Sequence, residues 1–226
     1  SSSMISAKQP QPLPDKVQGA QVKAKDLSLQ LPNGSELYRG LSFQIKDGER
    51  LIILGPSGAG KTTLIRALAG MWSDGEGELQ VSSSTVFLPQ EPYLPEGSLR
   101  RVLTFPHEHF LDQEVLDAAG RAKLQDVLGR FQSSLDAEAD WETVLSRGEK
   151  QRCAFCRLLL LRPQVAVLDE ATSALDEATE GALYEELLLL SPPVSVVSIS
   201  HRPALSRFHS HALRYQGLNE NLDGFA

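Results

Sequence analysis

The sequence lacks the features that mark several large classes of protein. Its two cysteines in 226 residues are too few for a disulfide framework. The longest apolar runs, such as Leu158–Leu161, are far shorter than the roughly 20 residues that cross a bilayer, so we expect no transmembrane helix in this chain. Acidic residues outnumber basic ones, 29 to 22, for a formal net charge of -7. We expect no nucleic-acid partner, because that kind of binding relies on a basic surface.

The chain is long enough for one α/β domain with a sizeable core and a smaller inserted lobe. Residues 1–20 are rich in proline, glutamine and serine and show no apolar periodicity, which is typical of a flexible linker or a cloning remnant. We assign residues 21–226 to a single domain. Apolar residues with helical spacing over Glu114–Phe131 and Gly148–Leu161 predict a helical subdomain at about 94–162.

The most informative segment is a glycine-rich loop between the apolar run Leu51–Leu54 and the helix-like stretch Leu64–Leu68, which fits G-x-x-x-x-G-K-[ST]. Backbone N–H groups of such a loop can surround phosphate oxygens, helped by the positive end of the helix dipole. Lys61 would add a charge to the outer phosphates, and the Thr62 hydroxyl would contact a phosphate-bound Mg²⁺. A turn that binds nothing is the alternative, but the strand–loop–helix context favours a nucleoside triphosphate. The candidate nucleotide-binding residues are Gly55, Pro56, Ser57, Gly58, Ala59, Gly60, Lys61, Thr62 and Thr63.

Two stretches before this loop have the character of strands. Val22–Leu31 and Leu41–Ile45 are separated by the turn signal Pro32-Asn33-Gly34. Together they predict an antiparallel layer beside the main sheet.

Two later apolar runs, Pro163–Glu170 and Val194–His201, each end on polar residues. In a parallel sheet, ligand chemistry gathers at the carboxyl ends of the strands. We therefore expect Asp169, Glu170 and His201 beside the glycine-rich loop. The predicted fold class is α/β, with a P-loop NTPase core, a mainly parallel sheet, an antiparallel β layer and an inserted helical subdomain.

The adjacent acids Asp169 and Glu170 point to a bound cation, because two carboxylates at a strand end are costly without one. Asp169 would hold Mg²⁺ directly or through water, and Glu170 could accept a proton from an attacking water. An acidic strand end that only caps the helix near Ala171-Thr172 is the alternative.

The order of the motifs carries a family resemblance. After the glycine-rich loop come Gln90 within Phe87–Pro92, the signature segment Leu145–Arg152, the run Leu168–Asp176, and Ser200–Pro203. This ordered set resembles the nucleotide-binding domain of an ATP-binding-cassette (ABC) transporter over residues from about 22 to 217. More narrowly, Asp140-Trp141 and the sequence after His201 resemble half-transporters of the peroxisomal fatty-acyl (D) subfamily and of bacterial vitamin B12 or peptide uptake.

The resemblance implies roles for single residues. Gln90 would contact the metal and relay the nucleotide state to a membrane-spanning half, so Thr62, Gln90 and Asp169 become the candidate metal ligands. His201 would contact the γ-phosphate and hold the attacking water. Together with Glu170 and Lys61, His201 and Gln90 form the candidate catalytic set.

The signature segment has two interpretations that are compatible. Ser146 and Glu149 form a capping-box pattern for the following helix. The resemblance implies that the same helix start, through Ser146, Gly148 and Glu149, faces the γ-phosphate of ATP held by a second copy of the domain. It also implies that Asp176 lies at that interface, although its segment alone is an ordinary helix cap.

Two positions depart from the family pattern. Arg147 stands where the family usually has glycine, which adds bulk and charge at the surface facing the partner's phosphate. No aromatic residue lies near Leu31 to stack on adenine, and Tyr38 is the nearest candidate, with packing in the core as the alternative.

The cysteines and histidines give weaker signals. Cys153 and Cys156 form a C-x-x-C that would be a dithiol in a redox enzyme, but inside a helical run we expect them to pack as small buried residues. The pairs His107/His109 and His209/His211 have no obvious set of partner ligands for a metal.

The function predicted from these observations is an ATP-binding and ATP-hydrolysing motor domain of a membrane half-transporter. It would use ATP and Mg²⁺, dimerise head-to-tail with a second copy, and act on the cytoplasmic side of a membrane. Its transmembrane partner would precede it in the same full-length polypeptide. A soluble ABC ATPase acting on ribosomes or DNA is the alternative. A non-catalytic nucleotide-gated module is a third, which the presence of both Glu170 and His201 disfavours.

Overall fold

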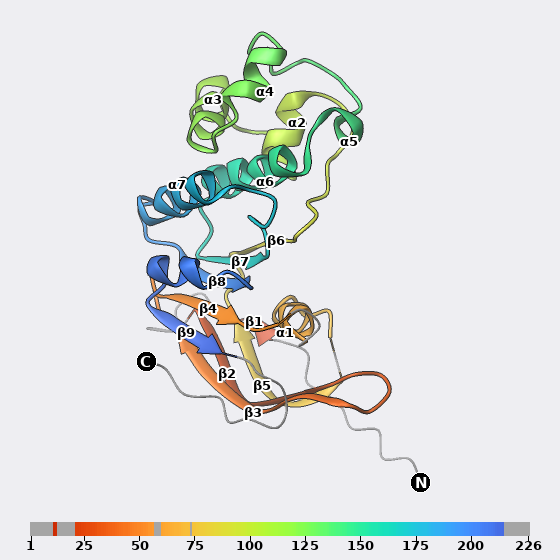
Figure 1. Ribbon diagram of the computed structural model, residues 1–226, viewed down its shortest axis with the longest axis vertical. Coiled ribbons are helices and arrows are strands. Elements are labelled where there is room, and N and C mark those ends of the chain that lie inside the picture. The colour runs from red at the N-terminus through yellow and green to blue at the C-terminus, as the bar shows by residue number, and fades with distance from the viewer. Residues whose placement is uncertain (1–10, 13–20, 57–59, 73, 215–226) are drawn as a thin grey trace. The chain divides into compact units, whose positions relative to one another are not determined.

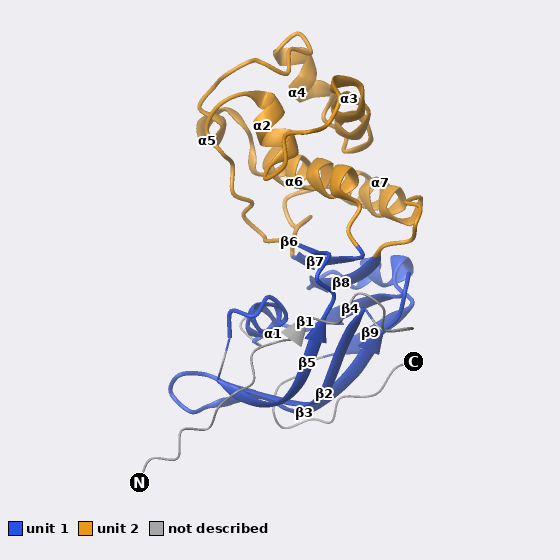
Figure 2. Cartoon of the chain, turned by 180° about the vertical axis from the view of Figure 1, so that it is seen from behind, with its two compact units in different colours: residues 1–87, 164–169, 195–226 blue, residues 88–163, 170–194 orange. Residues whose placement is uncertain are grey.

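The computed structural model describes residues 11–12, 21–56, 60–72 and 74–214 (Figure 1). The chain divides into two compact units (Figure 2). Unit 1 takes residues up to Phe87, Gln164–Asp169 and the stretch from Ser195 onward, and unit 2 takes Leu88–Pro163 and Glu170–Val194. The predicted helical subdomain, about 94–162, therefore lies within unit 2.

Unit 1 is built on two sheets. Its elements are β1 (Gln11–Pro12), β2 (Val22–Gln30), β3 (Glu36–Ile45), β4 (Arg50–Leu54), α1 (Lys61–Leu68), β5 (Gly75–Val81), β6 (Thr85–Leu88), β7 (Val165–Asp169), β8 (Ser195–Ser200), the 3₁₀ helix η1 (Pro203–Phe208) and β9 (His211–Arg214). One sheet has the strand order β1-β5-β2-β3, in which β2 pairs antiparallel with both β3 and β5. The other has the order β6-β7-β8-β4-β9, in which β7, β8, β4 and β9 run parallel. The predicted α/β class, with a parallel sheet and an antiparallel layer, is confirmed.

The register of the parallel sheet brings the predicted strand ends to one level. Asp169 on β7 lies opposite Ile199 on β8, and Ile199 lies opposite Ile53 on β4. Leu54, directly before the glycine-rich loop, pairs with Ser200, directly before His201. The polar residues that follow these strands thus emerge at the same edge of the sheet, because the carboxyl ends of neighbouring parallel strands lie together.

The hydrophobic pattern explains why these strands take their places. Leu51–Leu54 is buried at every position, as expected for a central parallel strand covered on both faces. In β2, buried and exposed residues alternate up to a bulge near Asp26, which fits a strand with only one face in the core. Leu64 and Ile65 of α1 join the same core. Removing one such fully buried leucine side chain typically costs about 2–5 kcal/mol.

Unit 2 is helical. It holds α2 (Leu99–Thr104), α3 (Asp112–Arg121), α4 (Gln125–Arg130), α5 (Trp141–Val144), α6 (Arg147–Leu161) and α7 (Glu177–Leu188). Helix α6 is the central element, since α2, α3 and α7 all contact it (Figure 1). Phe155 and Leu158 of α6 are fully buried. The predicted helix Gly148–Leu161 is confirmed, with one more residue at its start.

The prediction of a continuous helical stretch over Glu114–Phe131 is wrong in one respect. The structure breaks it into α3 and α4 at Lys123, whose φ of 60° is left-handed. Apolar periodicity alone did not reveal the break, because Leu124 is fully buried and continues the apolar stripe across it.

Over the described residues, no helix has the length and hydropathy of a membrane span.

Candidate functional site

The glycine-rich loop leads into α1 through Gly60. Gly60 is the N-cap of α1 and has a φ of 89°, a left-handed conformation that glycine adopts without strain. A Cβ at this position would lie 3.0 Å from the Leu37 side chain. Among the described residues no side chain caps α1, so its first N–H groups are not taken by a capping side chain. This arrangement fits a phosphate group, which such a helix start attracts.

Lys61, the first residue of α1, lies over the loop that precedes it. Its Nζ donates to the carbonyl oxygens of Gly55, at 2.7 Å, and Pro56, at 2.6 Å. Only 5% of Lys61 is exposed, whereas Thr62 beside it is exposed. The predicted binding residues Ser57, Gly58 and Ala59 lie outside the described residues.

The two strand-end residues in unit 1 occupy the places that the sequence predicted. Asp169 ends β7 and is half-buried, and His201 follows β8 and is exposed. The backbone N–H of Arg202 donates to the Ser200 hydroxyl at 3.0 Å, which fixes the turn just after His201.

Glu170 begins the segment of unit 2 that follows β7, and its backbone is unusual. Its φ of 47° lies in the left-handed region, which typically costs a non-glycine residue about 1–3 kcal/mol and occurs often at functional sites. The Gln90 Nε2 donates to the Glu170 carboxylate at 3.0 Å. The structure thus joins two candidate catalytic residues that lie 80 positions apart.

The candidate metal ligands offer only oxygen donors. The Thr62 hydroxyl, the Asp169 carboxylate and the Gln90 amide are the donor types that suit Mg²⁺. Over the described residues, no group of three or more histidine, cysteine, aspartate or glutamate side chains is close enough to hold a metal ion. Mg²⁺ is usually bound by one or two carboxylates together with phosphates and water, and this set of donor types fits such a metal.

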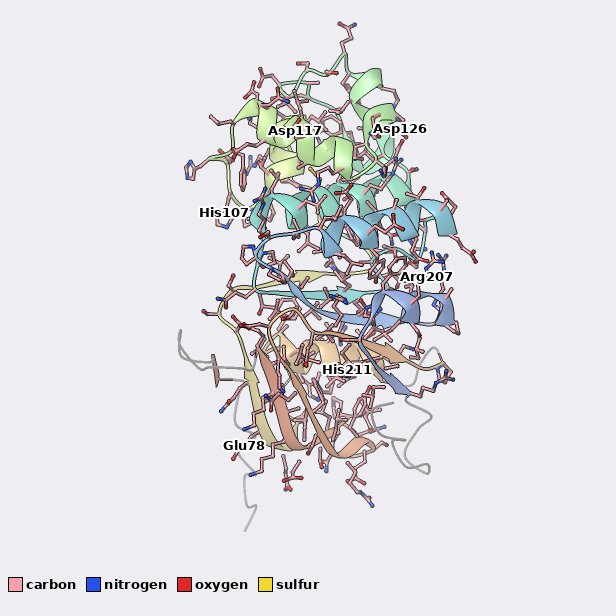
Figure 3. All side chains as sticks on the ribbon, turned by 90° about the vertical axis from the view of Figure 1, so that its left-hand side faces the viewer. Glu78, His107, Asp117, Asp126, Arg207 and His211 are labelled. Atoms are coloured by element: carbon pink, nitrogen blue, oxygen red, sulfur yellow. The ribbon has the colours of Figure 1, made fainter. Side chains whose placement is uncertain are left out.

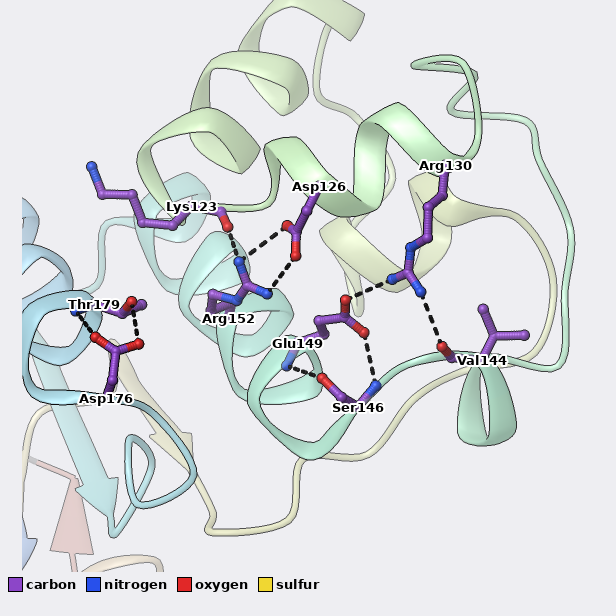
Figure 4. A network of polar contacts seen from close by, with 9 residues as sticks. All are labelled: Lys123, Asp126, Arg130, Val144, Ser146, Glu149, Arg152, Asp176 and Thr179. Atoms are coloured by element: carbon purple, nitrogen blue, oxygen red, sulfur yellow. Dashed lines mark hydrogen bonds and ion pairs between the residues drawn. The ribbon is translucent and has the colours of Figure 1, made fainter.

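The signature segment forms the start of α6, and a small polar network fixes it (Figure 4). The Ser146 hydroxyl accepts from the Glu149 N–H at 3.3 Å, and the Ser146 N–H donates to the Glu149 carboxylate at 2.8 Å. This is the predicted capping box. The carboxylate also accepts from Arg130 of α4 at 2.7 Å. Arg130 in turn donates to the Val144 carbonyl at 3.4 Å, so one guanidinium joins both ends of the turn before α6.

Gly148 has close neighbours in the same unit. A Cβ there would lie 3.3 Å from the Ala174 carbonyl oxygen and 3.2 Å from the Leu175 side chain. A larger residue would push the first turn of α6 away from this segment. Arg147 beside it is exposed, so its bulk is accommodated outside the fold.

Comparisons with known proteins identify the family. The family profile described as ABC transporter matches residues 38–173. The chain belongs to the ABC transporter family.

Individual relatives place this ATP-binding domain more closely. An uncharacterized ABC transporter ATP-binding protein of Synechocystis is 40% identical over 88% of this chain and 30% of its own length. The chloroplastic ABC transporter D family member 2 of Arabidopsis thaliana is 35% identical over 85% of this chain and 34% of its own length. The predicted resemblance to the D subfamily is confirmed. The chain spans about a third of the length of these relatives.

A solved structure supports the fold. A bacterial Atm1-family ABC exporter with ATP bound superposes with a TM-score of 0.80 and 27% identity, over 93% of this chain and 41% of that chain. The P-loop NTPase part of the fold prediction is thereby confirmed. None of these matches supports the alternative of an ABC protein that acts on ribosomes or DNA.

Asp176 is a helix cap in this ABC domain. Its carboxylate accepts from the Thr179 N–H at 2.9 Å and from the Thr179 hydroxyl at 2.8 Å (Figure 4). The bond from the Thr179 N–H, and after it the bond from the Thr179 hydroxyl, hold the pKa of the Asp176 carboxyl below its ordinary value. A role at a dimer interface stays a prediction.

The structure contradicts the assignment of Tyr38 as the residue that stacks on adenine. Tyr38 is 1% exposed and belongs to the hydrophobic core of unit 1. A ring that is covered on both faces cannot stack on a base, so the alternative of core packing is correct. The periodicity of β3 gave the signal, because Tyr38 lies on the buried face of that strand.

The two cysteines are structural. Cys153 and Cys156 are free, and neither is exposed. Burial raises the pKa of the Cys153 thiol to about 12 and that of Cys156 further, so neither forms a reactive thiolate near neutral pH. The prediction that they pack as small buried residues is confirmed.

Among the described residues, neither histidine pair belongs to a group of three or more histidine, cysteine, aspartate or glutamate side chains that could hold a metal ion. His107 follows α2 and His211 begins β9, in different units of the chain (Figure 3). His209 has both ring nitrogens engaged, with the Leu205 carbonyl and the Ser198 hydroxyl, each at 2.8 Å. Burial lowers the pKa of His209 to about 4, so it is neutral at physiological pH.

Two residues that contact the candidate site were not predicted from the sequence. Arg130 fixes the capping box from another helix, and Gln151 contacts Gln90 and Glu170 from inside α6. Gln151 had a visible signal, since it is a polar residue on the apolar face of a helix. Arg130 had none, because its partner lies 19 positions away.

Proposed function

We propose that this chain is the ATP-hydrolysing motor domain of a membrane half-transporter. The hydrolytic part of this proposal rests on the hydrogen bond between Gln90 and Glu170. Glu170 directly follows Asp169 in the sequence. The hydrogen bond links a metal-ligand candidate to the candidate general base. A nucleotide-gated module that binds ATP without hydrolysing it does not require a general base.

The phosphates of ATP are held in unit 1. The first N–H groups of α1 surround the phosphate oxygens, and Lys61 adds its charge to the outer phosphates. Lys61 already donates to two loop carbonyls, so binding exchanges these bonds for bonds to phosphate. Thr62, Asp169 and Gln90 would hold Mg²⁺, which would supply positive charge to balance that of the phosphates.

Hydrolysis requires a base and a residue that orients the water. Glu170 accepts the proton from the attacking water, and the amide of Gln90 holds the carboxylate in place. His201 contacts the γ-phosphate from the end of β8. Catalysis of this kind is mostly positioning and charge stabilisation.

The partner in this reaction is a second copy of the domain. The start of α6 combines a capped helix end, the close-packed Gly148 and the exposed Arg147. A helix end of this kind attracts anions, and we assign it to the γ-phosphate on the partner. ATP then stabilises a head-to-tail dimer by binding to both copies.

The motor would act on a transmembrane domain in the same full-length polypeptide, on the cytoplasmic side of a membrane. The names of the relatives and the short share of their length that this chain covers support this proposal. Reading the upstream coding sequence is the direct test. We expect apolar stretches of membrane-spanning length there. Their absence from the complete polypeptide would contradict the proposal that this domain drives a transmembrane domain of the same chain.

The hydrolytic proposal is tested with Glu170→Gln. We expect the variant to lower kcat by about 10²–10⁴-fold, because loss of a general base typically costs this much, while ATP binding persists. Glu185→Gln, at an exposed position of α7, makes the same chemical change away from the site and is expected to keep the parent's rate. Glu170→Gln turning over ATP at the parent's rate would show that another group is the base.

A further inference from the structure

Gln151 is a fully buried amide at the centre of unit 2. It lies on α6, five residues after Ser146, and none of its surface is exposed. Its Nε2 donates to the Gln90 carbonyl at 3.0 Å, to the Ser173 hydroxyl at 3.3 Å and, more weakly, to the Glu170 carbonyl at 3.5 Å. Its Oε1 accepts from the Ala174 N–H at 3.0 Å.

These contacts converge on the pair that the proposed function places at the reaction. Gln151 bonds to the backbone of Gln90 and of Glu170, whose side chains are themselves in contact at 3.0 Å. Both residues lie outside helices and strands, so no ladder of backbone bonds fixes them. The left-handed φ of Glu170 also requires surrounding structure to hold it.

We propose that Gln151 is a positioning residue for ATP hydrolysis, which sets Gln90 and Glu170 relative to each other and fastens both to α6. The proposal rests on the proposed function, because it assigns Gln151 to the same reaction. Gln151 does not touch substrate. It acts through the two residues whose backbone it holds.

The same helix carries the signature segment at its start. In the head-to-tail dimer of the proposed function, that start faces ATP on the partner, whereas Glu170 acts on the chain's own ATP. A single helix therefore connects the two nucleotides. Gln151 links this helix to Glu170, the proposed general base. A small shift of α6 would reach Glu170 through this amide, since a buried amide has no water to replace its partners.

A purely structural amide would act differently. Such a residue would only satisfy loop carbonyls, and its loss would lower stability and activity together. A positioning residue lowers kcat while the affinity for ATP, held by unit 1, stays nearly constant. The two roles are separated by comparing kcat with KM.

The test uses Gln151→Met, which keeps the side-chain volume and removes all of its hydrogen bonds. We expect kcat to fall at least tenfold and KM to change less than threefold. The matched control is Asp126→Asn, which weakens the bidentate pair of Asp126 with Arg152, the neighbour of Gln151 on the same helix. This control disturbs the packing of α6 away from Gln90 and Glu170, and we expect its kcat within twofold of the parent's.

A second variant serves if Gln151→Met does not fold. Gln151→Asn keeps an amide but shortens the side chain by one methylene, so that it no longer reaches Gln90, Ser173 and Ala174 together. We expect its kcat to fall at least tenfold and its KM to change less than threefold.

Three results would overturn the proposal. In the first, Gln151→Met turns over ATP within twofold of the parent. In the second, Asp126→Asn loses as much kcat as Gln151→Met. In the third, Gln151→Asn keeps kcat within twofold of the parent's. A parent chain that binds ATP without hydrolysing it would instead overturn the proposed function, which separates the two failures.

Discussion

Lys61 shows how a single residue connects the local fold to nucleotide binding. Its side chain is 5% exposed and bonds to the carbonyls of Gly55 and Pro56, so its charge is held over the loop before any ligand arrives. A buried lysine needs such partners, because an uncompensated buried charge is expensive. The same geometry keeps the ammonium at the start of α1, where phosphate is expected.

We predict that Lys61→Ala weakens ATP binding about tenfold or more, which corresponds to about 1.4 kcal/mol. Arg66→Ala is the control, since Arg66 is an exposed cation on the same helix. Titration calorimetry with ATP and Mg²⁺ measures both variants. Equal losses of affinity would mean that general charge, rather than the placement of Lys61, attracts the nucleotide.

His209 gives unit 1 a dependence on pH. Its folded-state pKa of about 4 lies below the ordinary value of 6.5, so the unfolded chain binds the proton more tightly. Its contribution to stability is complete above pH 6.5 and is lost as the pH falls towards 4. Between pH 7 and pH 5 this contribution amounts to about 2 kcal/mol.

We predict that His209→Gln removes this dependence. Urea unfolding at pH 7 and pH 5 should show the parent losing about 2 kcal/mol more than the variant. Comparing the two proteins cancels the titration of the carboxylates that they share. Parallel losses in parent and variant would show that His209 titrates normally in the folded state.

At the scale of elements, α6 is both a core helix and the carrier of the signature segment. Its N-cap Ser146 and the N-cap of α2, Ser98, make the same kind of bond, to the Glu149 N–H at 3.3 Å and the Arg101 N–H at 3.4 Å. Only the first of these caps is assigned to a nucleotide.

This pair of caps supports a matched prediction. Ser146→Ala and Ser98→Ala should each lower the free energy of unfolding by about 0.5–2 kcal/mol. Only Ser146→Ala should also weaken the dimer that ATP induces, and sedimentation of both variants with ATP and Mg²⁺ measures this. If the two caps affect the dimer equally, the start of α6 has no special part in it.

The elements also show what sequence can and cannot predict. Leu51–Leu54 and α6 were predictable, because a buried parallel strand and a capped helix each leave a continuous local pattern. The break at Lys123 was not, since the apolar stripe continues across it. The ion pair between Arg130 and Glu149 and the contacts of Gln151 were also not predictable, because they join residues 19 to 61 positions apart.

Over the whole molecule, the candidate site residues are distributed over both units of the chain. The glycine-rich loop, Asp169 and His201 belong to unit 1, whereas Gln90, the signature segment and Glu170 belong to unit 2. The sequence predicted the strands and the helix that carry these motifs, whereas the contact of each motif with nucleotide stays a prediction. The assignment of Tyr38 to adenine was wrong, because Tyr38 lies in the core.

We infer that one ATP binds to two copies of this domain and holds them together. Sedimentation equilibrium of Glu170→Gln tests it most directly, because slow hydrolysis lets the ATP-bound state accumulate. We predict a monomer without nucleotide and a dimer with ATP and Mg²⁺, and a return to monomer when Ser146→Ala is added. A Glu170→Gln protein that binds ATP, as shown by calorimetry, and stays monomeric at every protein concentration tested would show that ATP does not join two copies of this domain.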